Sequence, residues 1–454
     1  MNISNWRRYL IYSLILSLVS VLLLFLLREA IRWQRQQPVI SFLPQLNHQV
    51  LVVPSVQEPA MSPFKVLGNP ASLRYPDCKD EYARNPWSLK AFEGQLYIGL
   101  GDDDANAGPV PVYRFSSTAQ AFFEETTLPE EKIDRFYVFN GELFIPGDDP
   151  MQSWGLGNLY RQHKAQVWQQ LRTLPKTIHA HALAQFDGQL FAGVSNQDAA
   201  PANLHKDRYG SAVAISSDLG QTWKVQLLAG WRIFDFLIVG GKLYATDIFA
   251  GPGVKKWLNE RQRTNLHAGV YEYDLAGQFK RRPDLGGSVM FPNTLLATKR
   301  AAVIERAVQY GQGSVYIASF SQNQDALPTR VAYIANQLEQ GPVDVKRLAL
   351  PTDAIVWDLF VDKQGIWALF SQALPNGNWL NQVWRSADAE QWSTVTDFEN
   401  PAFARSFAKI GETLYFGLGS FNSKILEICD RHSANHNLGQ SVGTVLSLNL
   451  KKID

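Results

Sequence analysis

Aspartates occur in small groups along this chain, each group soon after a short apolar segment. The groups are Asp102, Asp103 and Asp104, then Asp148 and Asp149, and further along Asp247. Carboxylate oxygens grouped in this way can bind Ca²⁺, which prefers oxygen ligands, or accept hydrogen bonds from sugar hydroxyls. Aspartate is also common in turns, where its side chain bonds to the local backbone. Two hypotheses therefore stand: an acidic rim that binds a ligand, and a set of solvated turns.

A second group of polar residues stands at the start of successive apolar segments. Its members are Arg135, His181, Asp235, Arg306, Asp358 and Arg405. If these segments surround one axis, the side chains face a common channel, where mixed charge could bind an anionic or polar ligand. The alternative is a network of ion pairs that satisfy one another, whose net contribution to stability is usually small.

Other chemistries find less support in the sequence. His179 and His181 lie on one face of a strand, but no companion cysteine and no HExxH motif accompanies them, so a zinc site is not predicted. No Gly-x-Ser-x-Gly motif occurs. Glycosidases need two carboxylates about 5 to 10 Å apart, which the first two acidic loops could provide. The sequence assigns no catalytic residue and no cofactor, with Ca²⁺ as the one candidate ion.

A repeat along the chain supplies the elements that position these residues. A glycine followed by an aliphatic and then an aromatic residue recurs roughly every 50 residues, a period typical of propellers and solenoids. The copies begin at Gly94, Gly141, Gly188, Gly241, Gly313, Gly365 and Gly411. An apolar segment precedes each glycine, and pairs such as Asn140-Gly141 favour the tight turn of a hairpin.

Two further apolar segments follow most of these hairpins, so each unit has the four short antiparallel strands of a propeller blade. The sequence therefore predicts an all-β, seven-bladed β-propeller over residues 76–454. The longer gap between Gly241 and Gly313 leaves an eighth blade as an alternative to an insertion, for which we expect a short helix within Phe249–His267. In such a ring the acidic loops share one face.

One turn carries a more specific motif. Residues 216–223 read Ser-Ser-Asp-Leu-Gly-Gln-Thr-Trp, and residues 386–392 form a shortened copy. The chain thus resembles the Asp-box propellers, a superfamily that includes sialidases and many sugar-binding or scaffold propellers. The resemblance implies the fold and a structural turn built by Ser216, Asp218, Gly220, Thr222 and Trp223. It implies no sialidase activity, because the Arg-Ile-Pro signature is absent.

Segments around Asn106–Val112 and Ile145–Pro150 also resemble bacterial membrane-anchored propeller proteins of unassigned function. The start of the chain agrees with an anchor, because Tyr9–Leu27 carries no charge and has about the 20 residues that a membrane-spanning helix needs. We expect a short cytoplasmic N-terminus over residues 1–8, a transmembrane helix over 9–27 and a proline-rich tether over 28–75. A cleaved signal peptide is the alternative.

The two cysteines lie near opposite ends of the predicted ring. Cys78 precedes the first repeat and Cys429 lies within the last, so closure of the ring could bring them together. A disulfide would require an oxidising compartment, and the alternative is a pair of buried thiols. Together with the apolar segment, this favours a single-pass protein of the inner membrane with its propeller on the periplasmic side.

Charge excludes one class of function. Lys and Arg number 43 against 42 Asp and Glu, so the basic excess of a nucleic-acid-binding protein is missing. The first hypothesis is an exported binding or scaffold module, anchored in the membrane, for a glycan or a protein partner. The alternative is a carbohydrate-active enzyme, a glycoside hydrolase or lyase that uses the rim carboxylates. A pocket with two carboxylates beside an exposed aromatic residue favours the enzyme.

Overall fold

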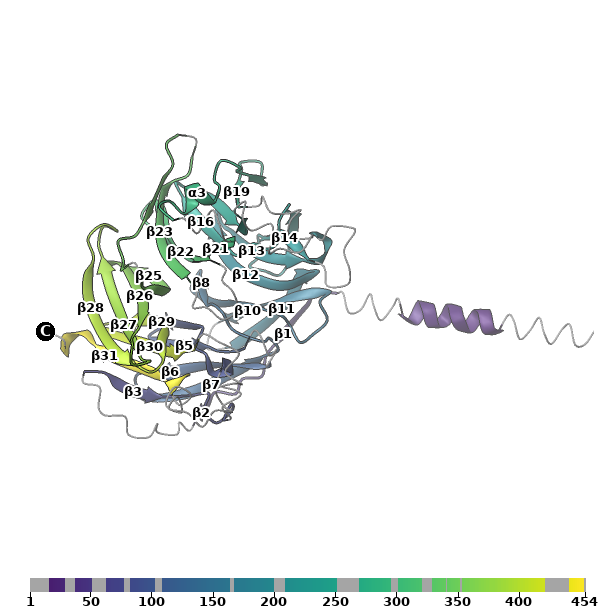
Figure 1. Cartoon of the computed structure of the whole chain (residues 1–454). Coiled ribbons are helices and arrows are strands. Elements are labelled where there is room, and N and C mark those ends of the chain that lie inside the picture. Colours follow the sequence, from purple (N-terminus) through teal and green to yellow (C-terminus); the bar gives the residue numbers. More distant parts are fainter. Residues whose placement is uncertain are drawn as a thin grey trace, which may run out of the picture.

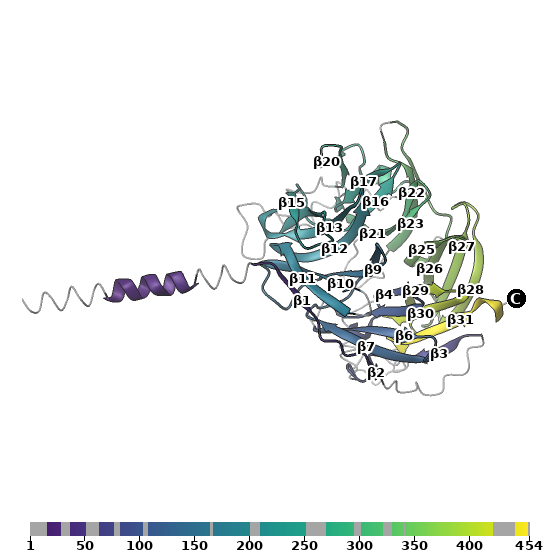
Figure 2. The same cartoon turned by 180° about the vertical axis from the view of Figure 1, so that it is seen from behind.

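The chain forms a ring of β-sheets around a common axis (Figures 1 and 2). The computed structural model describes residues 16–28, 37–50, 63–76, 82–102, 108–163, 167–199, 209–250, 269–294, 301–320, 329–339, 341–351, 353–420 and 441–452. Within these ranges the strands form seven antiparallel sheets of four or five strands. The predicted seven-bladed β-propeller is confirmed, and the count of seven holds over the eight-blade alternative.

Blades one to three come from the first half of the chain and run from the channel outward. Blade one holds β4 (Ser88–Phe92), β5 (Gln95–Gly99), β6 (Val110–Ser116), β7 (Ala121–Leu128) and, at its outer edge, β2 (His48–Val50). Blade two holds β8 (Tyr137–Phe139), β9 (Glu142–Pro146), β10 (Leu156–His163), β11 (Val167–Pro175) and outermost β1 (Val39–Phe42). Blade three holds β12 (Thr177–Phe186), β13 (Gln189–Asn196), β14 (Gly210–Ser216) and β15 (Lys224–Leu227), with the 3-10 helix η2 (Gln197–Ala199) after β13.

Blades four to seven complete the ring. Blade four holds β16 (Asp235–Val239), β17 (Lys242–Thr246), β19 (Val270–Tyr273) and β20 (Phe279–Arg281). Blade five holds β18 (Phe249–Ala250), β21 (Ala301–Tyr310), β22 (Gly313–Phe320), β23 (Thr329–Gln337) and β24 (Asp344–Arg347). Blade six holds β25 (Ile355–Asp362), β26 (Gly365–Ala373), β27 (Trp379–Ser386) and β28 (Ser393–Asn400). Blade seven holds β29 (Phe403–Ile410), β30 (Thr413–Gly419), β31 (Val445–Asn449) and β3 (Lys65–Gly68), followed by the 3-10 helix η5 (Leu450–Lys452).

The repeated glycines form the innermost hairpin of several blades. Asn140 and Gly141 both have positive φ, 51° and 74°, between β8 and β9. Asp187-Gly188 and Gly240-Gly241 adopt the same left-handed conformation in the next two blades. Two consecutive residues with positive φ match the right-handed twist of a strand pair, which explains why these dipeptides mark the turns.

The core lies between neighbouring blades rather than inside any one of them. Phe144 and Leu159 of blade two, for example, pack against Leu183 and Val194 of blade three, and all four are almost fully buried. Burying such a side chain contributes roughly 1.5–3 kcal/mol relative to leaving it exposed. Each blade therefore depends on two neighbours, including blades one and seven, where the rings of Phe115 and Tyr415 pack with centroids 6.2 Å apart.

The two ends of the chain meet in blade seven. β3 pairs antiparallel with β31, with Val66 opposite Leu446, so a strand from the start of the chain completes a sheet from its end. Beside it, the amide of Asn85 donates to the carbonyl of Ser420 at 2.8 Å and its oxygen accepts from the Ser420 N–H at 2.9 Å. The stretch that we expected to be a tether, residues 28–75, thus supplies β1, β2 and β3 to the ring.

Several expectations fall on parts of the chain outside the described residues. Cys78 and Cys429 both lie there, so their pairing stays a prediction. The helix expected within Phe249–His267 falls largely on residues 251–268, also outside them, whereas the short helix α3 (Gly287–Met290) follows blade four. Residues 16–28 are helical, but no described helix has both the length and the apolar character needed to cross a membrane.

The closure makes a testable prediction. Asn85→Ala removes two hydrogen bonds and leaves the buried backbone N–H of Ser420 without its partner, whereas the C=O keeps a bond from Arg405 at 3.0 Å. An unsatisfied buried N–H costs roughly 1–3 kcal/mol. We expect a clear drop in the urea midpoint of unfolding. Asn376→Ala is the matched control, since its bond to Glu399 is exposed. Equal midpoints for the two variants would contradict a role of Asn85 in closure.

Candidate functional site

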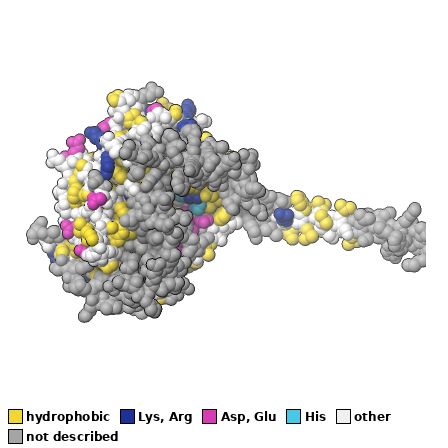
Figure 3. Space-filling view, viewed as in Figure 1, with side chains coloured by type: hydrophobic (Ala, Val, Ile, Leu, Met, Phe, Trp, Pro, Cys, Tyr) yellow, Lys and Arg dark blue, Asp and Glu magenta, His cyan; other side chains and the backbone are white. Residues whose placement is uncertain are grey.

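A cavity of about 570 Å³ opens at the end of the channel where the inner strands begin. It receives residues from both groups singled out in the sequence: Arg135, His181, Arg306 and Arg405 from the channel group, and Asp148 and Asp149 from the acidic loops. Figure 3 shows histidine, basic and acidic side chains next to one another on one face of the ring. The two groups, which the sequence treated separately, form one site.

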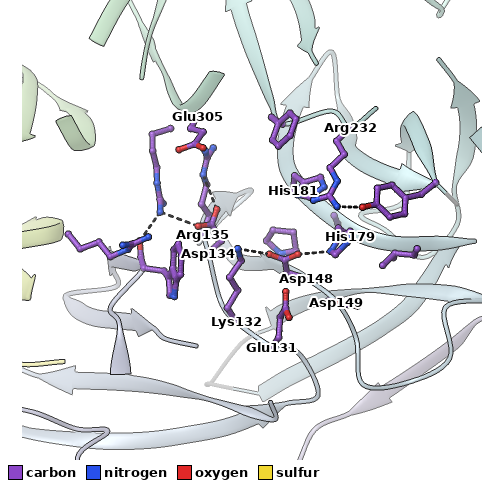
Figure 4. A pocket seen from close by; sticks show the side chains of 18 of the residues that line it. Glu131, Lys132, Asp134, Arg135, Asp148, Asp149, His179, His181, Arg232 and Glu305 are labelled. Carbon is purple, nitrogen blue, oxygen red and sulfur yellow. Dashed lines mark hydrogen bonds and ion pairs between the residues drawn. The ribbon is translucent and has the colours of Figure 1, made fainter. Parts of the chain in front are cut away.

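Asp148 links two blades and contacts the side chains of a histidine and a lysine at the cavity wall. Its carboxylate bonds to Nδ1 of His179 at 2.9 Å and lies 3.2 Å from Nζ of Lys132 (Figure 4). An isolated backbone bridge also pairs Asp148 with His179, which joins blade two to blade three. Burial acts to raise the pKa of the Asp148 carboxyl, but Lys132 and His179 outweigh it and hold that pKa well below its usual range. Asp148 is therefore ionised at neutral pH.

The neighbouring carboxyl, Asp149, has a different environment. Its backbone is in the left-handed region with φ 57°, and its half-buried side chain makes no hydrogen bond or ion pair with the described residues. Burial raises its pKa, and the charge of Asp148 adds to this against the attraction of His179 and Arg232. Two adjacent carboxyls thus have pKa values shifted in opposite directions.

Aromatic rings form one side of the cavity. The ring of His181 stacks between those of His179 and Phe234, with centroids 5.3 and 5.5 Å away. Nε2 of His181 lies 2.9 Å from the hydroxyl of Ser195. Burial and the nearby charges of Arg232 and His179 lower the pKa of His181 well below its usual value. This histidine is therefore neutral at pH 7 and acts as a polar ring rather than a cation.

Arg232 enters the cavity from the loop before β16. Its guanidinium lies over the ring of Tyr209 at 4.7 Å and over Trp231 at 4.9 Å, and it donates to the Tyr209 hydroxyl. Asp247 holds this loop, because its buried carboxylate accepts from the backbone N–H groups of Trp231 and Arg232. Burial raises the pKa of Asp247 to about 6. This acidic residue does not line the cavity and instead positions Arg232.

Ion pairs cross the channel at the floor of the cavity. Arg135 donates to Asp235 at 2.6 Å, and Arg306 reaches Asp134 at 3.3 Å and the carbonyl of Trp87 at 2.7 Å. A bulge in β21 places Arg306 there, since its φ of 53° breaks the register with β22. Arg135 and Arg306 thus form the ion-pair network that was the alternative to a ligand site for the channel group.

Three arginines of the cavity keep a buried donor without an acceptor. Among the described residues, the Nε–H groups of Arg135, Arg232 and Arg330 have no hydrogen-bond partner, although Arg135 Nε lies 3.7 Å from Asp134 and Arg330 contacts Glu305 at 2.9 Å. Buried polar groups in folded proteins are usually satisfied, so three such donors on the arginines of one cavity are unusual. The Nε atoms are shielded from the cavity, but the arginines that carry them line it, and an acceptor-rich ligand is the chemical complement of that lining.

The remaining candidate residues lie elsewhere. Asp358 faces the opposite end of the channel, Asp102 is buried outside the cavity lining, and Asp104 lies outside the described residues. Among the described residues, no three His, Cys, Asp or Glu side chains are grouped so as to hold a metal ion. The acidic loops therefore offer no described Ca²⁺ site.

The Asp-box segment forms a turn at the outer side of blade three, outside the cavity lining. Asp218 accepts from the N–H and the hydroxyl of Thr222 at 2.9 and 2.6 Å, and Ser216 accepts from the N–H of Gly220 at 2.8 Å. Gly220 has φ 90°, and a Cβ there would stand 2.5 Å from Leu159, so only glycine fits. The side chain of Trp223 donates to Thr173 at 3.0 Å.

Sequence reasoning missed several residues of the site. Lys132, Tyr209, Arg232 and Arg330 line the cavity but belong to no motif, and only their blade position could have suggested them. It also missed the fully buried Glu130, which anchors the loop that carries Lys132 and Arg135. Its carboxyl accepts from Tyr160 and Asn158, both at 2.6 Å, and burial raises its pKa to about 8.

Glu130 predicts a pH dependence of stability. Its pKa rises from the ordinary 4.5 to about 8 on folding, so the folded chain binds this proton more tightly. The stabilisation is full below pH 4.5 and is lost as pH rises toward 8. Glu130→Gln keeps the neutral form, so we expect it to match the native chain near pH 5 and to be more stable near pH 9 by on the order of 2–5 kcal/mol. Urea unfolding at both pH values tests this, with the exposed Glu390→Gln as control; parallel curves for native and Glu130→Gln would refute it.

Comparison with known proteins identifies no family and no activity for this chain. No protein-family model matches the chain, and no curated protein matches it, so the Asp-box resemblance rests on its own residues. Among solved structures, a putative 6-phosphogluconolactonase from Bacteroides uniformis is 11% identical with a TM-score of 0.42, over 69% of this chain and 85% of its own. The polysaccharide lyase Uly1 is 10% identical with a TM-score of 0.42, over 81% and 91%. The propeller domain of the Trilobed protease from Pyrococcus furiosus is 11% identical with a TM-score of 0.35, over 67% and 78%.

Proposed function

We propose that the cavity binds an acidic, hydroxylated ligand, and that a uronate-containing glycan is the class that fits it best. The observation that carries the proposal is the set of five arginines that line the cavity, Arg135, Arg232, Arg306, Arg330 and Arg405. A carboxylate accepts two parallel bonds from a guanidinium and therefore complements such donors in geometry as well as in charge.

Other features of the cavity agree with a sugar acid rather than a bare anion. Asp149 offers an acceptor for ligand hydroxyls, since the described residues leave it without a hydrogen bond. Trp154 lines the mouth and is 39% exposed, which suits an apolar sugar face. A volume of about 570 Å³ lies within the roughly 300–1,000 Å³ of typical ligand pockets.

Binding of oligogalacturonate, with neutral galactose oligomers for comparison, tests the proposal by calorimetry. Arg232→Gln should weaken oligogalacturonate binding about tenfold or more, because a hydrogen bond to a charged group contributes roughly 1.5–3 kcal/mol. Arg282→Gln is the matched control, because Arg282 bonds to Asp284 and to the Leu338 carbonyl outside the cavity. Unfolding midpoints check that both variants fold. Equal affinity for acidic and neutral oligomers, or equal losses in the two variants, would count against an acidic ligand.

One observation favours a carbohydrate-active enzyme as a second candidate. Asp148 is held ionised while the pKa of Asp149 is raised, and opposite shifts in adjacent groups are the usual basis of separate acid and base roles. Asp149 would donate the proton and Asp148, through His179, would supply the base.

The same oligogalacturonate samples, followed over time, decide between binding and turnover. If the chain is an enzyme, Asp149→Asn retains binding but stops product formation. A new reducing end without a double bond indicates hydrolysis, and an unsaturated product indicates elimination. If the native chain binds the oligomers and leaves them intact, the cavity serves binding alone.

We further propose that Tyr9–Leu27 anchors the ring to a membrane, with the ring on the external side, where it meets a glycan or a protein partner. Support comes from the uncharged run in the sequence and from the helical residues 16–28. Leu16→Arg combined with Leu23→Arg should move the chain from the membrane pellet to the soluble fraction, because a central arginine costs roughly 2.5–3.5 kcal/mol on insertion. A native chain that is already soluble would refute the anchor.

A further inference from the structure

The channel widens into a second cavity at its opposite end, where the inner strands finish. This cavity measures about 800 Å³ and is lined by residues of β4, β8, β21, β25 and β29. Arg135 and Arg306 line both cavities, so their ion pairs lie between the two. The opposite mouth is therefore a separate space with its own walls.

The walls of this mouth are largely apolar. Phe139, Val308 and Phe360 line it and are only half-buried, so their rings and methyl groups face the cavity. Val138, also in the lining, is 38% exposed. An apolar ligand would remove this surface from water, which is favourable by roughly 25 cal/mol per Å².

Most charged groups of the mouth are already satisfied. Lys409 donates to Asp362 at 2.9 Å and to the side chain of Gln364. Asp358 accepts from the backbone N–H groups of Leu359 and Phe407. Lys363 is exposed at the mouth.

Lys90 is the exception. It lies on the inner strand β4, is half-buried in the cavity wall, and makes no hydrogen bond or ion pair with the described residues. Burial lowers its pKa, and the charge of Asp358 only partly opposes this. The protein thus keeps an ammonium group in a site where holding its charge is costly.

We propose that this mouth is a binding site for a small carboxylate on an apolar body, with Lys90 as the cation that receives the carboxylate. One negative charge completes the partners of Lys90, and the rings of Phe139 and Phe360 contact the apolar part. A dianion such as phosphate fits less well, because the other buried basic groups of the mouth, Lys409, Arg135 and Arg306, are already paired and Lys363 is exposed. This site is independent of the glycan proposed for the first cavity.

The experiment uses the full chain and pairs of ligands that differ only in charge. Octanoate and 1-octanol have the same chain length, so the ratio of their affinities, measured by calorimetry, isolates the contribution of the carboxylate. The native chain should prefer octanoate about tenfold, as expected for a charge-assisted bond in a partly buried site. Lys90→Gln should remove the preference and leave octanol binding unchanged.

Lys363→Gln is the matched control, because it removes the same charge from the same mouth but at an exposed position. It should keep the preference for octanoate. Apolar binding elsewhere on the chain is common to all three proteins and cancels in the comparison. The proposal would be overturned if the native chain bound octanoate and octanol with equal affinity. It would also be overturned if Lys90→Gln and Lys363→Gln lost the preference for octanoate to the same extent.

Two additional measurements complete the test. A comparison of octanoate with 3-phenylpropionate separates a lipid-derived acid from an aromatic acid, and the tighter ligand indicates the source. The preference of the native chain for octanoate should also decline as the pH rises, and the decline should begin at a lower pH than that at which an exposed lysine loses its proton. The neutral amine of Lys90 carries no charge to pair with the carboxylate. A preference that is flat until the ordinary range of lysine would contradict the role of Lys90.

Discussion

Closure of the ring is the constraint on which the rest of this structure depends. A four-stranded blade has two apolar faces and cannot cover either by itself, so each blade is stable only between two others. Blades one and seven have to meet, and the chain achieves this by sending β3 from its beginning to pair with β31 near its end. The side-chain amide of Asn85 then joins the two ends through a pair of hydrogen bonds with the backbone of Ser420.

Closure also creates the channel and brings together the residues that line it. The inner strands all begin at the same end of the ring, so the residues that precede them converge there although they are far apart in sequence. Arg135 and Asp235 are 100 residues apart and form a buried ion pair. Such pairs contribute little net stability, but they fill the axis with charge and separate the two mouths.

The two mouths differ because the two ends of a strand carry different residues. At the first, long loops bring charged and hydrogen-bonding groups together, and Glu130 and Asp247 hold those loops from below through buried carboxyls. At the second, the ends of the strands carry aromatic and aliphatic side chains around Lys90. The same architecture thus offers one site suited to a polar acid and another suited to an apolar one.

The sequence by itself determined the local structure. Asn140-Gly141 and its counterparts predicted the hairpins because two consecutive positive φ angles favour these residues, and their period predicted the blades and their number. The Asp-box predicted a turn that is built from neighbouring residues. From the sequence we also expected Arg135, His181, Arg306 and Arg405 to face the axis, because each precedes an apolar segment of its repeat unit, and all four line the first cavity.

Only the tertiary structure decided which residues act together. No motif marks Arg232 or Arg330, and their contacts come from blades that meet in space, as do those of Asp148 with His179. Asp247 belongs to the acidic series in sequence, yet it turns inward to hold a loop, because backbone N–H groups lie within its reach. Local propensity depends on a few adjacent residues, whereas a site depends on distances across a closed ring, and the sequence contains no direct measure of those distances.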